Sequence, residues 1–590
     1  MPQLRLALAQ VNPCVGDLMG NATMIAACCR EARAAGAHLV VFGEMALTGY
    51  PVEDLALRES FVAASVHALQ ALAARLARAG CGEVPAVVGY LDSDDGGLRD
   101  AAAVLHRGRV LARQFKHHLP NYGVFDERRY FIPGTTLTVF RLYGLEIGMV
   151  ICEDLWQVGG PITALAQAGV DLVVAPNASP YERDKDDTRL ALVSRRAIEV
   201  SVPLAYANLV GGQDELVFDG DSMVVDGRGK LLVRAPQFIE YLLVTDVDLP
   251  GGSARATGRY AGLEVRRVVL AAEDMAPASP PARVAPTLEP LSAEAEVWSA
   301  LVTGLRDYAR KNGFRSVVLG LSGGIDSAVC AALAVDALGA EAVYGVSMPS
   351  SYSSAHSQSD AAELAERTGL HYRIQPIEDM VEIFVRQLGL SDIAEENVQA
   401  RCRGVILMAL SNQHGHLVLA TGNKSELAVG YSTIYGDAVG GFAPIKDVPK
   451  TAVWALARWR NAVAEKRGQT PPIPPNSISK PPSAELRPGQ LDADSLPDYL
   501  LLDEVLDNYV ENDRGFSDLV AVGFAPELIE HIVQLVDAAE YKRRQYPPGT
   551  KITLKAFGRD RRLPITNRWR ERAPRRAPAE PEWSEEGVPT

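Results

Sequence analysis

A glycine-rich turn in the middle of the chain limits what its C-terminal half can fold into. The apolar run Val317–Leu319 leads into Gly320-Leu321-Ser322-Gly323-Gly324-Ile325-Asp326-Ser327, and residues 328–338 have a helix-forming composition. A strand, a tight turn and a helix in this order point backbone N–H groups and a helix N-terminus at one spot, which makes an anion site. A Walker A loop has a lysine before its Ser/Thr, but that place holds Asp326. A carboxylate beside phosphates is repulsive unless a divalent cation lies between them, so the turn predicts ATP bound with magnesium.

The stretch Ser322–Ser327 resembles the SGGxDS signature of the ATP pyrophosphatases. That resemblance implies cleavage of ATP to AMP and pyrophosphate, with adenylation of a carbonyl oxygen. It also implies a Rossmann-like, doubly wound parallel sheet of the adenine nucleotide alpha hydrolase type. The alternative is an ordinary glycine-rich strand–helix turn, and the complete match in this context argues against it.

Length, charge and cysteine content narrow the class of protein. A chain of 590 residues is too long for one core and predicts two large domains. The formal charge of −14, from 59 Lys+Arg and 73 Asp+Glu, argues against a nucleic-acid partner. No apolar run reaches the roughly 18 residues of a membrane span, and the N-terminus lacks a signal-peptide core. The seven cysteines form no CxxC pair. We therefore expect a cytoplasmic protein without a membrane or nucleic-acid partner.

Strand-like and helix-like segments alternate in both halves, which predicts an α/β fold for each. In the first half we expect strands at 4–9, 39–42, 86–90, 147–151 and 172–175, helices at 21–35 and 62–79, and a hairpin over 221–234. We expect a first domain over 1–265, a Pro/Ala-rich linker over 266–290, a second domain over 291–569 and a disordered tail over 570–590. The proline-rich run 470–487 predicts a loop with no helix.

Three expected strands of the first half end in polar or reactive residues. Phe42 leads to Gly43-Glu44, Ile151 leads to Cys152-Glu153-Asp154, and Ala175 leads to Pro176-Asn177-Ala178-Ser179. Because α/β folds place ligands at the carboxyl ends of strands, we expect these ends to meet at one pocket. The two acids after Cys152 would raise its pKa, so the thiol needs a nearby cation to act as a nucleophile. Lys116 is the best candidate.

Phe42-Gly43-Glu44, Phe115-Lys116 with Leu119-Pro120, and Val150–Asp154 resemble the Glu-Lys-Cys triad of the nitrilase (carbon–nitrogen hydrolase) superfamily. The resemblance implies an αββα sandwich in which Cys152 attacks the side-chain amide of glutamine and forms a thioester. It implies that Glu44 is the general base and then the proton donor, and that Lys116 stabilises the oxyanion. By the same resemblance, Tyr122, Ser179 and Lys185 contact glutamine. Taken singly, a strand-end cysteine, an acid or a lysine is more often structural or solvated.

An amidase fused to an ATP pyrophosphatase implies a glutamine-dependent amide ligase, in which ammonia freed at one site attacks an adenylate at the other. Because ammonia is largely protonated at neutral pH, a sealed route between the sites would be advantageous. Further motifs resemble those of the NAD synthetases: Glu395–Arg401, Leu419–Glu426, Tyr435-Gly436-Asp437, Gly441–Ile445, Tyr541–Gln545 and Pro547–Thr553. The resemblance to the bacterial, glutamine-dependent members covers most of residues 1–570. It implies the last step of NAD biosynthesis, from deamido-NAD(+), ATP and L-glutamine to NAD(+), AMP, pyrophosphate and glutamate.

This resemblance also implies the roles of the residues in the second domain. Gly320, Leu321, Ser322, Gly323, Gly324, Ile325, Asp326, Ser327 and Thr421 would bind ATP. Asp326 and Glu426 would hold Mg²⁺, which prefers oxygen ligands. Asn397, Glu426, Asp437 and Lys542 would contact deamido-NAD(+), and Lys450 is a weaker candidate for a phosphate contact. The family relationship further implies a homo-oligomer.

Two other functions compete with this one. The acceptor could be a different carboxylate or carbonyl, as in asparagine or guanylate synthesis, but those families use other glutaminase folds. The chain could instead be a plain amidase whose second domain senses nucleotides, but the intact Asp326-Ser327 and Glu426 disfavour that role.

Overall fold

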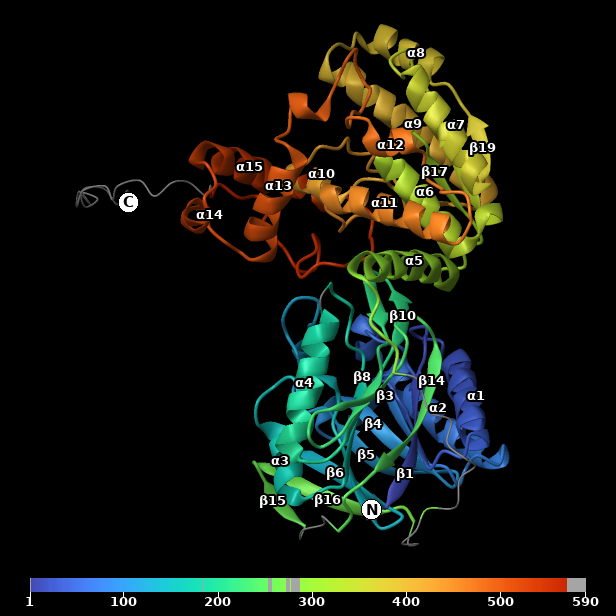
Figure 1. The fold of residues 1–590 in the computed structure, drawn as a ribbon, viewed down its shortest axis with the longest axis vertical. Coiled ribbons are helices and arrows are strands. Elements are labelled where there is room, and N and C mark those ends of the chain that lie inside the picture. Colours follow the sequence, from blue (N-terminus) through green and yellow to red (C-terminus); the bar gives the residue numbers. More distant parts are fainter. Residues whose placement is uncertain (1, 184, 253–256, 272–275, 277–286, 570–590) are drawn as a thin grey trace, which may run out of the picture. The chain divides into compact units, whose positions relative to one another are not determined.

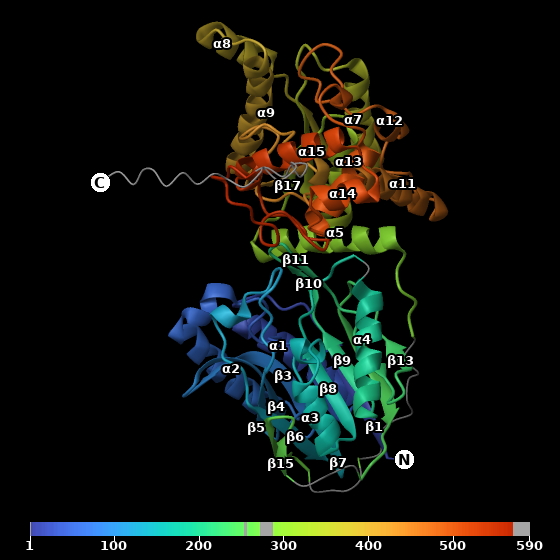
Figure 2. The same cartoon turned by 90° about the vertical axis from the view of Figure 1, so that its left-hand side faces the viewer.

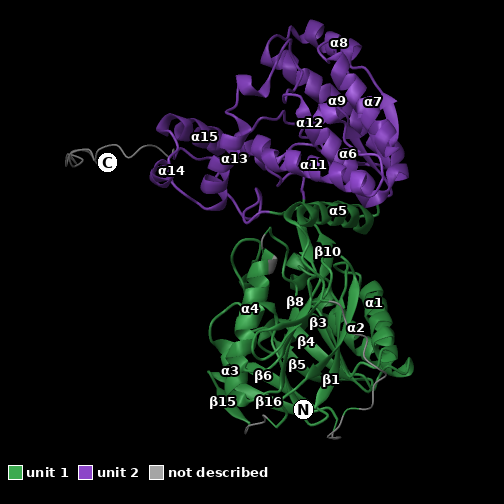
Figure 3. Ribbon diagram, viewed as in Figure 1, with its two compact units in different colours: residues 1–314, 550–552 green, residues 315–549, 553–590 purple. Residues whose placement is uncertain are grey.

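The structure consists of two compact units, and each unit is formed by two separate stretches of the sequence. This computed structural model describes residues 2–183, 185–252, 257–271, 276 and 287–569 (Figure 1). Unit 1 contains residues 1–314 and 550–552, and unit 2 contains residues 315–549 and 553–590 (Figure 3). The helix α5 (Ala293–Lys311), which we expected in the second domain, packs on a hairpin of unit 1. The predicted tail, and residues 272–275 and 277–286 of the predicted linker, lie outside the described residues.

Unit 1 is built on two sheets and a separate hairpin. The six-stranded sheet has the order β14 (Tyr241–Asp248), β1 (Gln3–Gln10), β2 (Leu39–Phe42), β3 (Ala86–Asp94), β4 (Gly97–His106), β5 (Arg109–Phe115). The eight-stranded sheet has the order β13 (Leu231–Arg234), β12 (Met223–Val225), β9 (Leu204–Asn208), β8 (Leu172–Asn177), β7 (Leu145–Met149), β6 (Thr136–Leu142), β16 (Leu263–Val269), β15 (Gly258–Tyr260). The hairpin pairs β10 (Val210–Gln213) with β11 (Leu216–Asp219).

The buried side chains of unit 1 form three apolar layers. Alternate residues of β1 and β8, such as Leu6 and Val174, fill the layer between the two sheets. On the outer face of the first sheet lie α1 (Leu18–Ala34) and α2 (Glu59–Arg78), and on that of the second lie α3 (Gly160–Ala168) and α4 (Lys185–Val200) (Figure 2). The αββα sandwich predicted for the first half is therefore present.

Most expected elements of the first half appear with small shifts at their ends. β2 has the predicted bounds, and β12 and β13 form the predicted hairpin. β7 ends at Met149, two residues before the expected end, because the chain turns through Val150 and Ile151 into a short 3-10 helix, Cys152–Leu155.

Helix α2 is the one described helix long and apolar enough to cross a membrane by length and composition. Its buried stripe includes Val62, Leu69, Leu72 and Leu76, which pack in the layer over the first sheet. Core helices of α/β layers pass the same test, so this helix is weak evidence for a membrane span.

Unit 2 contains a parallel sheet with the order β19 (His371–Ile374), β18 (Val343–Ser347), β17 (Val317–Gly320), β20 (Leu417–Val418). The crossing helices are α6 (Ile325–Leu338), α7 (Ala355–Thr368), α8 (Glu378–Leu388) and α9 (Ile393–His414). The parallel order agrees with the doubly wound sheet predicted from the glycine-rich turn. The remaining helices are α10 (Lys424–Val429), α11 (Lys450–Lys466), α12 (Pro475–Ser479), α13 (Tyr499–Leu506), α14 (Phe516–Val522), α15 (Pro526–Ala538) and α16 (Glu540–Arg543).

The prediction that residues 470–487 contain no helix was wrong, because α12 lies within this run. Pro475 is at the first turn of α12, where a missing N–H is tolerated and a fixed φ favours the helix. The rest of the run is irregular, as predicted.

Candidate active sites

The local backbone places Cys152 at a strained turn. β7 runs toward this residue, and the 3-10 helix Cys152–Leu155 follows. Cys152 has φ 42°, in the left-handed region that non-glycine residues rarely adopt. Asp154 holds the turn, because its carboxylate accepts hydrogen bonds from the N–H groups of Ile151 (3.1 Å), His117 (3.2 Å) and His118 (2.8 Å). The turn that carries Cys152 is thereby fastened to the residues that follow Lys116.

The Lys116 ammonium lies in the middle of three buried carboxylates. Its Nζ is 2.5 Å from Glu44 Oε1, 2.8 Å from Glu127 Oε1 and 3.4 Å from Asp100 Oδ2. Three carboxylates that converge in this way resemble a metal site, but here the Lys116 ammonium occupies the point where they meet. Glu44 comes from the end of β2, Lys116 from the end of β5 and Asp100 from β4, so the order of strands in the first sheet brings the charges together.

Burial and neighbouring charges shift the pKa values of Asp100, Glu127 and Lys116. Burial raises the pKa of Asp100 well above its ordinary value, and the charge of Glu44 raises it further. Burial also raises the pKa of Glu127 to about 7, although Lys116 opposes this. Burial lowers the pKa of Lys116, but Glu127, Glu44 and Asp100 outweigh it and hold that pKa well above the ordinary value. Lys116 is therefore a permanent cation beside Glu44.

Cys152 is a neutral thiol at rest. Burial is the largest cause that raises its pKa well above the ordinary value, and Glu44 adds to it. Lys116 and the N–H of Ala178 act in the opposite direction. The Ala178 N–H also donates to Glu44 Oε2 (2.9 Å). The raised pKa agrees with the direction we predicted, but burial and Glu44 matter more than the two acids that follow Cys152. A base must take the thiol proton before the sulfur can attack, and Glu44 is the carboxylate in place.

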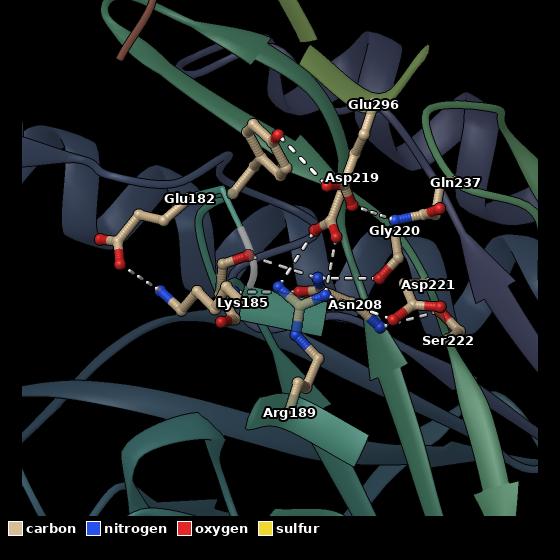
Figure 4. Close-up of polar contacts among 12 residues, drawn as sticks. Glu182, Lys185, Arg189, Asn208, Asp219, Gly220, Asp221, Ser222, Gln237 and Glu296 are labelled. Carbon is tan, nitrogen blue, oxygen red and sulfur yellow. Dashed lines mark hydrogen bonds and ion pairs between the residues drawn. The ribbon is translucent and has the colours of Figure 1, made fainter. Parts of the chain in front are cut away.

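Ser179, at the end of β8, is held by the end of the neighbouring strand β9. Its N–H donates to Asn208 Oδ1 (2.9 Å), and Asn208 Nδ2 donates to Ser179 O (3.3 Å) and to Gly220 O (2.9 Å). Figure 4 shows Asn208 at the centre of this network. Below it, Arg189 of α4 makes a two-pronged pair with Asp219, at 2.7 and 3.1 Å. The loop that carries Ser179 is thus fixed by hydrogen bonds to the buried side chain of Asn208.

The other two candidates for contacting glutamine lie on either side of the residues that follow Cys152. The hydroxyl of Tyr122 donates to Glu153 Oε2 (2.9 Å), and half of the Tyr122 side chain is exposed. Lys185 begins α4, and its Nζ lies 3.8 Å from Glu182 and 6.0 Å from the centre of the Trp156 ring. Both side chains therefore pack against the segment 152–156.

In unit 2, the glycine-rich turn joins β17 to the N-terminus of α6. Gly323 has φ 74°, and a Cβ there would lie 2.3 Å from the carbonyl oxygen of Ser357, so no other residue fits. Ser322 Oγ and Ser327 Oγ are 3.1 Å apart, and the Gly324 N–H donates to Ser322 Oγ (3.2 Å). The turn is closed by its own hydroxyl groups, which leaves the start of α6 facing a cavity.

Asp326 and Glu426 converge on the ammonium of Lys450. Lys450 Nζ lies 2.5 Å from Asp326 Oδ2 and 3.1 Å from Glu426 Oε1. The other oxygen of Asp326 accepts from Asn423 Nδ2 (2.9 Å). Burial raises the pKa of Glu426 to about 7, and the two carboxylates raise the pKa of Lys450 above its ordinary value. The carboxylate oxygens of Asp326 and Glu426 are the type of ligand that Mg²⁺ prefers.

A cavity of about 290 Å³ opens in front of the turn. Of the residues predicted to bind ATP, those that line it are Gly320, Leu321, Ser322, Gly324, Ile325, Asp326 and Thr421. A smaller adjoining cavity of about 100 Å³ is lined by Ser327 and Gly422 and shares Asp326, Thr421 and Glu426 with the first. The structure therefore brings the predicted ATP residues together around these two cavities. Gly323 lines neither cavity and instead allows the tight backbone turn.

The residues predicted to contact the dinucleotide fall into two groups. Glu426 and Asp437 line both cavities. Asn397 accepts from the hydroxyl of Thr433 (2.7 Å), and Lys542 Nζ donates to the carbonyl groups of Gly430 and Ser432, both at 2.7 Å. Asn397 and Lys542 thus hold the segment 430–433 beside the smaller cavity.

Both halves of the chain match known families. Residues 5–256 match the carbon-nitrogen hydrolase family, and residues 297–546 match the NAD synthase family. The glutamine-dependent NAD(+) synthetase of Xanthomonas campestris pv. campestris is 47% identical over 573 residues, which cover 96% of this chain and 97% of that protein. The enzyme of the same name from Thermotoga maritima is 44% identical over 587 residues, which cover 97% and 100%. This chain belongs to the glutamine-dependent NAD(+) synthetases.

A solved structure supports the same assignment. The glutamine-dependent NAD(+) synthetase of Acinetobacter baumannii, in complex with ADP, is 40% identical, covers 97% of this chain and 100% of its own, and has a TM-score of 0.71. The predicted activity, glutamine-dependent synthesis of NAD(+), is confirmed, and so is the pairing of a nitrilase-type domain with an ATP-pyrophosphatase domain. Synthesis of asparagine or guanylate and a plain amidase activity are set aside.

Several residues of these glutamine-dependent NAD(+) synthetase sites were missed by the sequence predictions. Glu127 and Asp100 complete the cage around Lys116, Asn208 holds Ser179, and Arg403 lines the larger cavity. Glu127 follows the segment of Tyr122 closely, which is a weak local signal. Asp100 and Asn208 lie within or at the end of strands, and no local pattern marks either one.

Proposed function

We propose that Cys152, Glu44 and Lys116 form the glutaminase site of this enzyme. The observation that carries the proposal is the Glu44–Lys116 pair at 2.5 Å beside a neutral, buried thiol. Glu44 takes the proton of Cys152 as the sulfur attacks the side-chain carbonyl carbon of glutamine. The positive charge of Lys116 stabilises the oxyanion that forms.

The same residues complete the reaction. When the tetrahedral intermediate collapses, Glu44 returns its proton to the leaving nitrogen, so that ammonia departs and a thioester remains on Cys152. Glu44 then takes a proton from water as the water oxygen attacks the thioester. The C–S bond breaks, glutamate leaves, and Glu44 returns the proton to the Cys152 sulfur. The Ala178 N–H, which bonds to Glu44 Oε2, keeps this carboxylate oriented through both halves. We assign Tyr122, Ser179 and Lys185 to the binding of glutamine, and Glu127 to the orientation of Lys116.

In unit 2 we assign ATP to the cavity at the start of α6. The N–H groups of the turn Gly320–Ser327 and the positive end of the α6 dipole favour phosphate there. Lys450 adds a cation next to this anion site, and Thr421 lines both cavities. Deamido-NAD(+) would occupy the neighbouring space near Glu426 and Asp437, and Asn397 and Lys542 would shape that space through the segment 430–433.

Asp326 and Glu426 would hold Mg²⁺, because both carboxylates line the two adjoining cavities and offer the oxygen ligands that this ion prefers. When bound, the ion would neutralise charge on the phosphate oxygens of ATP. The chain itself holds the carboxylates in place, through Asn423 on one side and Lys450 on the other.

A pair of variants tests the two-site proposal. Cys152→Ala should abolish NAD(+) formation from glutamine and retain formation from added ammonium. Asp326→Ala should abolish formation from both nitrogen sources. Product analysis with deamido-NAD(+), ATP and either nitrogen source reads out both variants. Ammonium-driven activity that disappears in a folded Cys152→Ala variant would contradict the assignment.

We further propose a cytoplasmic homo-oligomer. All seven cysteines are free thiols, which fits a reducing compartment. Within unit 2, α8 and the start of α9 expose Phe384, Leu388 and Ile393, the last two by 65% and 72%. Large apolar side chains gathered on adjacent helices favour contact with a second copy. Light scattering after size-exclusion chromatography should show a smaller particle for Phe384→Glu than for the unchanged protein.

A further inference from the structure

A three-residue piece near the C-terminus is part of the glutaminase unit. Thr550–Ile552 belongs to unit 1, although the chain on both sides of it belongs to unit 2. The Lys551 N–H donates to Glu215 O (2.8 Å), and Ile552 O accepts from the Arg183 N–H (2.9 Å). Arg183 lies in the loop between Ser179 and Lys185, the two residues assigned above to glutamine. The segment is therefore bonded directly to the loop that shapes the glutamine site.

The side chain of Lys551 reaches the same loop. Only 4% of this side chain is exposed, and its Nζ lies 3.4 Å from Glu182 Oε1. The other oxygen of Glu182 lies 3.8 Å from Lys185 Nζ. Figure 4 shows Glu182 and Lys185 turned toward each other at the start of α4. Glu182 therefore lies between two ammonium groups, one from its own loop and one from the distant segment.

The charge of Glu182 helps to keep Lys185 protonated. Burial lowers the pKa of Lys185, the carboxylate of Glu182 is the main group that raises it, and Arg189 and Lys551 lower it. Without Glu182, the Lys185 ammonium would face the cationic groups of Arg189 and Lys551 with weaker compensation. Glu182 thus supports both the charge and the position of Lys185.

The segment is also firmly held within unit 2, on each side of Lys551. Pro548 O accepts from the Ala443 N–H (2.8 Å), and Thr553 bonds to Asp447 and to Lys424 Nζ, at 2.8 and 2.6 Å. These bonds restrict the positions that the backbone of Lys551 can take. Lys551 therefore belongs to a segment whose two flanks are hydrogen-bonded, and not to a free tail.

We propose that Lys551 and Glu182 are positioning residues for the glutamine site: Lys551 orients Glu182, and Glu182 holds the Lys185 ammonium where it contacts glutamine. This inference rests on the proposed function, in which Lys185 binds glutamine. A segment near the C-terminal end of the described residues thereby supplies a side chain that the glutaminase unit needs in order to bind its substrate, although Lys551 is about 370 residues from Glu182 in the sequence.

Steady-state kinetics of the full-length enzyme test this role. Glu182→Gln and Lys551→Met should each raise the KM for glutamine about fivefold, because this factor corresponds to the free energy of a partly buried ion pair. The kcat should stay within about twofold of that of the unchanged enzyme. The double variant should have the same KM as Glu182→Gln, because Lys551 acts through Glu182. Lys551→Arg, which keeps the charge, should stay near the unchanged enzyme. Ammonium-driven synthesis should be unaltered in all four variants.

Lys555→Met is the matched control. Lys555 lies four residues further along the same segment and pairs with Asp513 of unit 2, so its loss should leave the KM for glutamine unchanged. Additive effects in the double variant, an unchanged KM in Lys551→Met, or an equal loss of ammonium-driven synthesis would each overturn the inference. Lys185→Met distinguishes failure of the proposed role of Lys185 in glutamine binding from failure of the inference about Glu182 and Lys551. An unchanged KM in that variant contradicts the assignment of Lys185 to glutamine, whereas a raised KM there with no effect of Glu182→Gln contradicts this inference alone.

Discussion

Replacing Lys116 with methionine removes the cation that neutralises the buried cage of Glu44, Asp100 and Glu127. Removal of one partner from a buried ion pair costs roughly 3–5 kcal/mol, because the remaining charge is left in a poorly solvated place. For a unit of this size each kcal/mol shifts the midpoint of thermal unfolding by about 2 °C. We therefore expect the transition of unit 1 to fall by about 6–10 °C at pH 8.

The loss should be smaller at lower pH. Burial already raises the pKa of Glu127 to about 7 while Lys116 is present. Lys116 lowers the pKa of both Glu127 and Asp100, so without its ammonium the folded state would bind protons on these two carboxylates even more tightly relative to the unfolded state. The unfolding free energy of the variant then falls as pH rises from 6 to 8. At pH 6 the midpoint should lie closer to that of the unchanged protein.

Differential scanning calorimetry at pH 6 and pH 8, with one scan rate throughout, measures both effects. Lys230→Met is the matched control, since Lys230 is exposed and should leave the midpoint unchanged. Lys116→Met should also lose NAD(+) formation from glutamine and retain formation from ammonium. A midpoint at pH 8 equal to that of the control would refute the view that Lys116 neutralises this cage.

Three further changes address the groups around the glutaminase site. Glu127 has a folded-state pKa of about 7 against an ordinary 4.5, so its contribution to stability is lost as pH rises through this window; in Glu127→Gln the thermal midpoint should fall less between pH 5 and 7. Arg189→Met should lower the unfolding free energy by roughly 3–5 kcal/mol, measured by thermal unfolding, because Asp219 then stays buried without its cation. Asn208→Ala should raise the KM for glutamine about tenfold, because Ser179 loses both of its bonds to this amide, with ammonium-driven synthesis as the control.

Residues that sit at the ends of elements could be predicted from the sequence. Glu44 follows β2, and the turn Gly320–Ser327 connects β17 to α6, so a short local pattern marks each of them. Cys152 follows β7 in the same way, although the strand ends earlier than expected. In these cases the chemistry and the local backbone are encoded within a few neighbouring residues.

Residues that act through the order of strands could not be predicted in this way. Asp100 lies inside β4, and it reaches Lys116 because β4 and β5 are neighbours in the first sheet. Lys450 meets Asp326 from a different helix, more than 100 residues away in the chain. The assignment of α5 and of residues 550–552 to unit 1 is likewise a property of tertiary packing. The sequence does not predict helix α12 for another reason: proline disrupts the interior of a helix but is tolerated in its first turn, where Pro475 lies.

The glutaminase unit cannot be isolated intact by a single cut in the chain, because Thr550–Ile552 belongs to it. A gene cut after residue 265, or even after 314, would omit Lys551 and leave the Arg183 N–H and the Glu215 carbonyl without the backbone partners they have in the whole chain. Such a fragment would lack the hydrogen bond from the Arg183 N–H to Ile552 O, which holds the loop between Ser179 and Lys185. A faithful isolated unit would need residues 550–552 to be returned to it, for example as a separately added peptide or a redesigned C-terminal extension.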